Sequence, residues 1–324
     1  MDEFMENDLI ISLQSFRDEN TAKLIGNFTS TIIKELEKEY KLNISKLKKI
    51  VITYDFDTAL DEIAKEYGYK SSSYTNNEHV TAIAQLQPKL DSKGLYSEFT
   101  LVLSIAFFRE LFNKDGSISS FDNISNIIHM MHHELIHVHE INECKFDAGK
   151  LVYEYDNAIL MTSTRSWSEF LANYMSSKTA TPEIIKKDLN TLETVLIKVP
   201  KEIESFVKEY KTGSLSLNDM YFNVVQKIKL IANSYGYAFG YISALEISPE
   251  LYPSSLSDLL EKTKLGLLLK ELGKYFLELT NIFNQGNLSD YNIFENANKT
   301  VLSIYKLFGL SLERQDKQLY VHVD

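Results

Sequence analysis

The chain has 324 residues, of which 44% are hydrophobic and 24% are charged, as in a globular protein with room for two domains. Its net charge of −11 excludes a general nucleic-acid binder and disfavours binding to a membrane surface, because both partners attract a basic face. The single cysteine, Cys144, excludes an internal disulfide and every zinc site built from several cysteines.

The same sequence carries no membrane or export signal. No segment approaches 18 uninterrupted apolar residues, and the acidic N-terminus lacks the basic and apolar regions of a secretory signal. We therefore expect a cytoplasmic protein with no membrane partner. The sequence leaves its oligomeric state open.

The first half of the chain alternates helical and strand patterns. Helices are expected where apolar residues recur every three or four positions, and strands where β-branched residues form short runs. The two strands before the last helix are expected to pair as a hairpin through a turn near residues 91–94. In chain order we predict a helix over 21–40, a strand over 49–54, a helix capped by Asp57, strands over 80–86 and 99–103, a short helix over 107–112 and a long helix over 122–142.

From residue 182 onward strand patterns nearly vanish. The fold class expected from this order is α+β, with a mixed helix-and-sheet domain over residues 1–180 and a mainly helical domain over residues 181–324. Long amphipathic stretches cover 182–211, 217–245, 255–284 and 289–308, and a last β-like piece over 318–323 is expected to form an edge strand.

The helix over 122–142 contains the sequence His133-Glu134-Leu135-Ile136-His137, which matches the H-E-x-x-H pattern. Residues four apart lie one above the other on a helix, so both histidines can reach one metal ion. Glu134 lies about 100° further round, where it can accept a proton from a metal-bound water instead of binding the metal. The opposite face of this helix is apolar, at Ile128, Met131, Leu135 and Val138.

A catalytic zinc site needs a third protein ligand. Our candidate is Glu169, because Ala172, Asn173 and Ser176 on its side of a predicted helix leave room for a second helix. Glu140 shares the histidine face and either orients a ligand or is an exposed acid at the end of the helix. His129 is interpreted as a packing residue, with a place in the lining of the cleft as the alternative. Competing acidic ligands lie between the two helices, at Glu143, Asp147, Glu154 and Asp156.

With these residues the chain resembles the gluzincin metallopeptidases, which combine H-E-x-x-H with a glutamate on the next helix. The resemblance covers about residues 20–180 and implies a zincin-like catalytic domain, in which the motif helix packs under a twisted sheet and an edge strand binds extended peptide. It also implies a donor to the oxyanion from a later helix, for which Tyr237 and Tyr241 are candidates. Packing in an aromatic core is the alternative for both tyrosines.

The expected function is hydrolysis of peptide bonds in a peptide or protein substrate. One Zn²⁺ ion, bound by His133, His137 and Glu169, would polarise the scissile carbonyl and lower the pKa of a water, with Glu134 as general base. Two alternatives stay open: a regulatory binding protein that keeps the zincin fold, and a di-iron carboxylate protein. The second is disfavoured because it needs another Glu-x-x-His motif, which the chain lacks.

Overall fold

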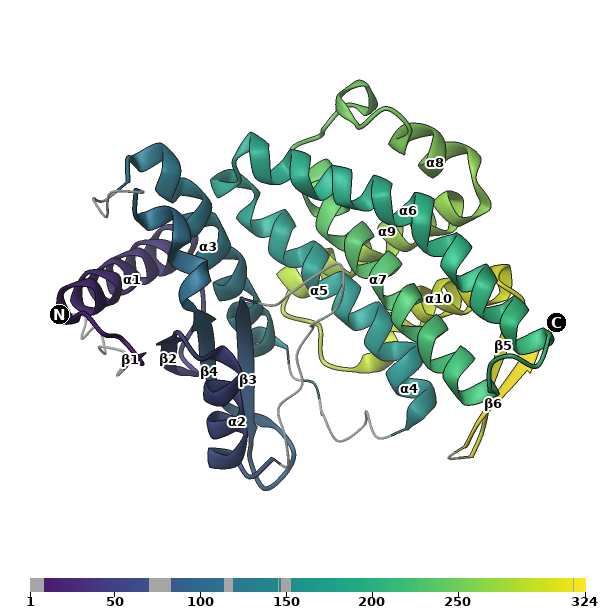
Figure 1. The fold of residues 1–324 in the computed structure, drawn as a ribbon, viewed down its shortest axis with the longest axis horizontal. Helices are drawn as coiled ribbons and strands as arrows, with labels where there is room; N and C mark the ends of the chain where they lie inside the picture. The colour runs from purple at the N-terminus through teal and green to yellow at the C-terminus, as the bar shows by residue number, and fades with distance from the viewer. Residues whose placement is uncertain (1–8, 70–82, 114–118, 145, 147–152, 317) are drawn as a thin grey trace. The chain divides into compact units, whose positions relative to one another are not determined.

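The computed structural model describes residues 9–69, 83–113, 119–144, 146, 153–316 and 318–324, and shows a mixed α/β protein (Figure 1). The chain divides into two compact units, residues 1–148 and 149–324. The sequence placed the change of domain at residues 180–181. The units divide earlier because the helix that carries Glu169 packs with the helices that follow it.

The first unit contains a four-stranded mixed sheet in the order β1-β2-β4-β3. Strands β1 (Ile10–Gln14), β2 (Leu47–Thr53) and β4 (Tyr96–Ser104) run parallel, whereas β3 (Ala84–Leu90) is antiparallel to β4. The central strands β2 and β4 hold most of the buried positions of the sheet. Strand β3 therefore forms one edge of the sheet and β1 the other.

Helices α1 (Glu19–Tyr40), α2 (Phe56–Glu66) and α3 (Phe121–Glu143) and the 3-10 helix η1 (Ile105–Leu111) complete this unit. Their positions confirm the predicted helices. The predicted cap of α2 is wrong, because Asp55 and not Asp57 accepts the backbone N–H of Thr58, at 3.3 Å.

The hairpin of β3 and β4 is confirmed, although residues 80–82 of the first predicted strand lie outside the described part. Strand β1 is absent from the sequence prediction. Apolar and polar residues do not alternate regularly over its five positions, so its sequence does not predict a strand. The strand is recognised from its parallel pairing with β2.

The second unit is mainly helical. The predicted stretch 182–211 matches its longest helix, with Pro200 tolerated inside. The stretch 255–284 is two helices, because the Thr263 hydroxyl accepts the N–H of Gly266 at 2.9 Å and starts a new one. The helices are α4 (Glu154–Ala158), α5 (Leu160–Ser176), α6 (Pro182–Lys211), α7 (Leu217–Ala244), α8 (Leu256–Lys262), α9 (Lys264–Asn284) and α10 (Glu295–Leu307), with 3-10 turns η3 (Ser177–Thr179), η4 (Pro249–Leu251) and η5 (Tyr291–Phe294).

The predicted strand at the end of the chain is present as β6 (Gln318–Val323). It pairs in antiparallel fashion with β5 (Leu310–Gln315), which the sequence analysis missed. The pair forms its own two-stranded sheet, so β6 is not an edge strand of the four-stranded sheet.

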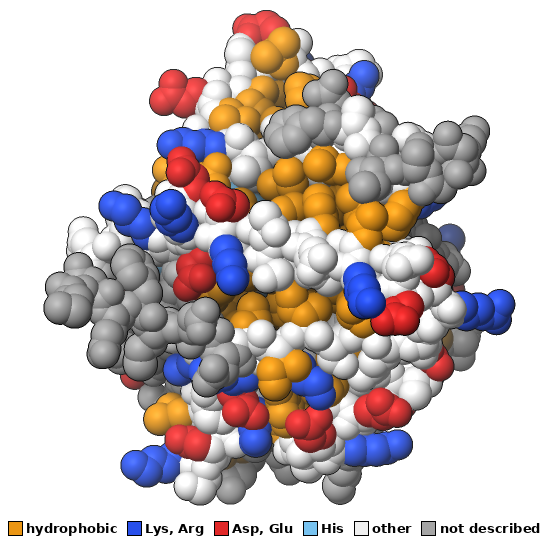
Figure 2. Space-filling model, turned by 90° about the vertical axis from the view of Figure 1, so that its left-hand side faces the viewer, with side chains coloured by type: hydrophobic (Ala, Val, Ile, Leu, Met, Phe, Trp, Pro, Cys, Tyr) orange, Lys and Arg blue, Asp and Glu red, His pale blue; other side chains and the backbone are white. Residues whose placement is uncertain are grey.

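Both units leave some hydrophobic side chains exposed, and no helix among the described residues is long and apolar enough to cross a membrane. Figure 2 shows hydrophobic side chains between charged ones on one face. In the first unit Ile10 and Tyr54 are 61% and 56% exposed. Scattered exposed hydrophobic residues are normal in folded proteins, so these do not define a binding surface by themselves.

The core of the second unit is built around Trp167 of α5. Its indole is fully buried, lies at ring-centroid distances of 6.0 Å from Phe283 and 5.6 Å from Phe294, and donates to the hydroxyl of Thr280 of α9 at 3.2 Å. This hydrogen bond satisfies the one polar atom that the indole brings into the core.

We predict that Thr280→Val lowers the free energy of unfolding of the second unit by about 1–3 kcal/mol, since the buried indole N–H loses its acceptor while the side-chain shape is kept. Urea titration followed by Trp167 fluorescence measures the loss, because Trp167 is the only tryptophan. Thr300→Val is the matched control, since the Thr300 hydroxyl donates only to Asn296 of its own helix. Equal effects of the two substitutions would contradict the prediction.

Candidate metal centre

Helix α3 brings the two histidines of the motif together. The Nε2 atoms of His133 and His137 are 3.1 Å apart, and the rings are nearly perpendicular, at 83°. Two nitrogens bound to one tetrahedral zinc ion at 2.0–2.1 Å would be about 3.3 Å apart. The pair therefore has the separation that a shared ion requires.

The opposite face of α3 is buried, as its sequence predicts. Met131, Leu135 and Val138 are at most 1% exposed, and Ile128 is half-buried. This apolar packing fixes the rotation of the helix, so both motif histidines face away from the core that Leu135 and Val138 enter. Glu134 is half-buried next to the pair in sequence.

The other histidines of α3 serve packing. His132 is fully buried with its ring centroid 4.0 Å from that of Tyr40, and burial lowers its pKa to about 4. Nδ1 of His139 accepts a hydrogen bond from the backbone N–H of Asn43 at 2.9 Å. Burial lowers the pKa of the His139 imidazole. His129 is 3% exposed. The packing interpretation of His129 agrees with this burial.

Glu140 lies one turn beyond His137. One of its carboxylate oxygens is 3.6 Å from Nδ1 of His137, slightly longer than a hydrogen bond, and its side chain is 9% exposed. A carboxylate at this place favours a proton on Nδ1, which leaves Nε2 of His137 as the atom with the free lone pair. The predicted orienting role of Glu140 is thus geometrically possible.

Glu169 lies on α5, the most enclosed helix of the second unit. Trp167, Phe170 and Leu171 are fully buried, as expected for its apolar stripe. Ala172, Asn173 and Ser176 are also at most 1% exposed, so the side that the sequence suggested as an open approach is itself packed. Glu169 is half-buried among these neighbours.

Helix α7 occupies that side of α5 through two glycines. A Cβ atom at Gly236 would lie 2.3 Å from the carbonyl oxygen of Ser166, and one at Gly240 would lie 2.7 Å from that of Phe170. The amide of Asn173 donates to the carbonyl oxygen of Tyr237 at 3.0 Å. Backbone-to-backbone packing therefore fixes the segment of α5 that carries Glu169.

His133, His137 and Glu169 carry donor atoms that could hold a metal ion. The two histidines belong to the first unit and the glutamate to the second. The donor set fits zinc, because two imidazoles and one carboxylate are a known ligand set of catalytic zinc sites and leave one position open. These are the three ligands that the sequence analysis selected.

The competing acidic ligands have other contacts. Asp156 is 8% exposed and accepts from Arg314 of β5 at 3.0 Å, and Glu143 accepts the amide of Asn43 at 2.7 Å. Nothing in the sequence signals the Arg314 contact, since the two partners are 158 positions apart. Asp147 and the side chain of Glu154 lie outside the described residues.

The two candidate oxyanion donors lie one turn apart on α7. Tyr241 is 1% exposed, and burial together with the nearby Asp188 raises the pKa of its hydroxyl. Tyr237 is half-buried, and its backbone carbonyl binds Asn173 of α5. Burial favours the packing interpretation for Tyr241, whereas the ring of Tyr237 keeps partial access to solvent.

Comparison with known proteins gives no further guidance: no family model, curated protein or solved structure matches the chain.

We predict that Gly240→Ala destabilises the second unit. The added methyl group would overlap the backbone of α5, so the helices must separate at a cost of about 1–3 kcal/mol or more. Thermal unfolding measures the effect. Gly26→Ala is the control, because its methyl group would meet only the end of the Leu13 side chain, at 3.2 Å.

Proposed function

We propose that this protein is a zinc-dependent peptidase in which His133, His137 and Glu169 bind the ion. The observation that carries the proposal is the 3.1 Å separation of the two Nε2 atoms on one face of α3, with Glu134 following the first ligand directly. The grouping of Glu169 with this pair supports it. The resemblance to the gluzincins rests on the same four residues.

The ion would supply Lewis-acid chemistry, polarising a carbonyl and lowering the pKa of a water. Glu134 is the one carboxylate of the motif, and it is not among the proposed metal ligands. It would accept the proton of the attacking water and deliver it to the leaving amine. Glu140 would hold His137 with its proton on Nδ1, so that Nε2 points to the ion.

Strand β3 supports an extended peptide as the substrate. It is an edge strand that also contacts α3 within the first unit. The hydroxyl of Tyr69 donates to the carbonyl of Pro88 and accepts from the N–H of Leu90, so these groups point away from β4. The period-two alternation puts the backbone of Leu86 on the same outer side. Its carbonyl accepts the side-chain amide of Gln85 at 3.4 Å, a contact that a pairing peptide strand would replace.

Of the two tyrosines, Tyr237 is the better candidate for stabilising the oxyanion, because a buried Tyr241 hydroxyl cannot reach a substrate without rearrangement. This assignment depends on the peptidase proposal. Tyr237→Phe would lower kcat and leave zinc binding unchanged if the hydroxyl acts only on the transition state.

We predict that Glu134→Gln retains stoichiometric zinc but loses at least about a hundredfold in kcat, because general-base catalysis contributes about 10²–10⁴. Digestion of a broad peptide library measures the activity, and metal analysis of the same sample measures zinc. Full activity of the zinc-loaded variant would remove Glu134 from the mechanism.

A second prediction concerns the third ligand. Glu169→Ala should lower zinc affinity by more than about a hundredfold, since even an outer partner of a ligand is worth about 10–100-fold. Asp156→Ala, a carboxylate removed from an ion pair with Arg314, should retain stoichiometric zinc. Competition with a chromogenic chelator gives both affinities, and the reverse order would assign the ligand to Asp156.

A further inference from the structure

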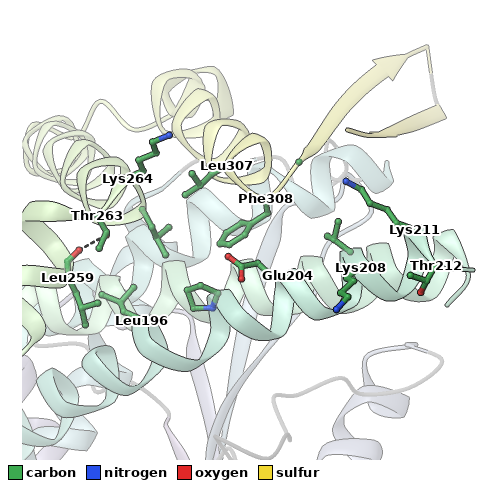
Figure 3. A pocket seen from close by; sticks show the side chains of 14 residues that line it. Leu196, Glu204, Lys208, Lys211, Thr212, Leu259, Thr263, Lys264, Leu307 and Phe308 are labelled. Atoms are coloured by element: carbon green, nitrogen blue, oxygen red, sulfur yellow. Dashed lines mark hydrogen bonds between the residues drawn. The ribbon is translucent and has the colours of Figure 1, made fainter. Parts of the chain in front are cut away.

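The second unit contains a groove of about 620 Å³ that the proposed peptidase chemistry does not use. It is bordered by the C-terminal half of α6, by the junction of α8 and α9, and by the end of α10 (Figure 3). Its volume lies within the range of about 300–1,000 Å³ typical of sites for small organic molecules.

The floor of the groove is apolar. Leu196, Val207 and Leu265 are buried at 5%, 8% and 7% exposure, and Leu307 and Phe308 are half-buried above them. Binding of a hydrocarbon chain over side chains of this kind is favourable, because it removes apolar surface from water. Residues 196 to 208 span twelve steps of α6, or about 18 Å, which suits an elongated occupant.

The charged residues that line the groove carry a net positive charge, whereas the whole chain is negative. Three lysines and one carboxylate line it, namely Lys208, Lys211, Lys264 and Glu204, whereas the protein carries a net charge of −11. Within the described part of the chain, Lys208 and Lys264 make no ion pair, and Lys211 donates to the carbonyl oxygen of Asp324.

The two ends of the groove differ in charge. Figure 3 shows Leu196, Leu259 and one lysine, Lys264, toward one end, and the other two lysines, Lys208 and Lys211, with Thr212 toward the other. We propose that this groove binds a single-chain amphiphile with a carboxylate head group, with the hydrocarbon chain over the leucines and the carboxylate near Lys208 and Lys211. A fatty acid has this chemistry.

Glu204 provides an internal check on this assignment. It lines the middle of the groove, one helical turn before Lys208, and is exposed. Its charge would repel an anionic head group and attract a cationic one. Removing that charge must therefore change the affinities for the two kinds of amphiphile in opposite directions.

The test is isothermal titration calorimetry of the full chain with dodecanoate and dodecyltrimethylammonium, each below its critical micelle concentration, and with dodecanol below its solubility limit. We expect dodecanoate to bind most tightly. Across decanoate, dodecanoate and tetradecanoate the affinity should rise by about fourfold per methylene until the groove is filled. Glu204→Gln should strengthen dodecanoate binding and weaken binding of the ammonium compound.

Two further variants distinguish the groove from unspecific adsorption. Lys208→Gln with Lys211→Gln should weaken dodecanoate binding by at least about fivefold. The control pair, Lys198→Gln with Lys201→Gln, removes the same charge from exposed positions of α6 outside the groove and should have little effect.

Val207→Trp should fill the floor and abolish binding, with Leu307→Trp as a second variant if the first does not fold. The proposal is overturned if wild-type protein does not bind dodecanoate, if it binds the ammonium compound more tightly, or if the two lysine pairs have equal effects. None of these readouts involves zinc or peptide hydrolysis, so the result is independent of the proposed function.

Discussion

The second unit depends on the direct contact between the backbones of α5 and α7. Gly236 and Gly240 leave no side chain between these helices, and a methyl group at either position would overlap carbonyl oxygens of α5. The amide of Asn173 then spans the interface to the carbonyl of Tyr237. Because α5 is also packed against α9 through Trp167 and Thr280, it has little freedom to rotate or slide. A carboxylate on such a helix keeps a defined position at low entropic cost.

The sequence predicts most of the long helices well because each of these has an apolar stripe at helical spacing over its whole length. Helix α6 follows its predicted range of 182–211 even with Pro200 inside, since a long buried face outweighs one lost backbone hydrogen bond. Two of the failed predictions have a defining contact that is distant in the chain. Strand β1 exists because it pairs with β2, and the division between the units is earlier than predicted because α5 packs with α7.

The candidate metal site shows the same division between local and distant information. The pair of His133 and His137 follows from helical geometry alone, and so does the buried face beneath it. The choice of Glu169 over Asp156 relied on Ala172, Asn173 and Ser176 leaving an open approach. In the structure all three are buried, and Asn173 contacts α7. What weakens Asp156 as a rival is its ion pair with Arg314, which no local pattern reveals.

The protonation of the two imidazoles connects this geometry to metal binding. If the proton of His137 resides on Nδ1, facing Glu140 at 3.6 Å, its Nε2 directs a lone pair toward Nε2 of His133, 3.1 Å away. Without an ion, His133 must place a proton on that nitrogen to avoid two opposed lone pairs. A metal ion held by both residues would instead require a lone pair on both Nε2 atoms, with the proton of each neutral imidazole on Nδ1.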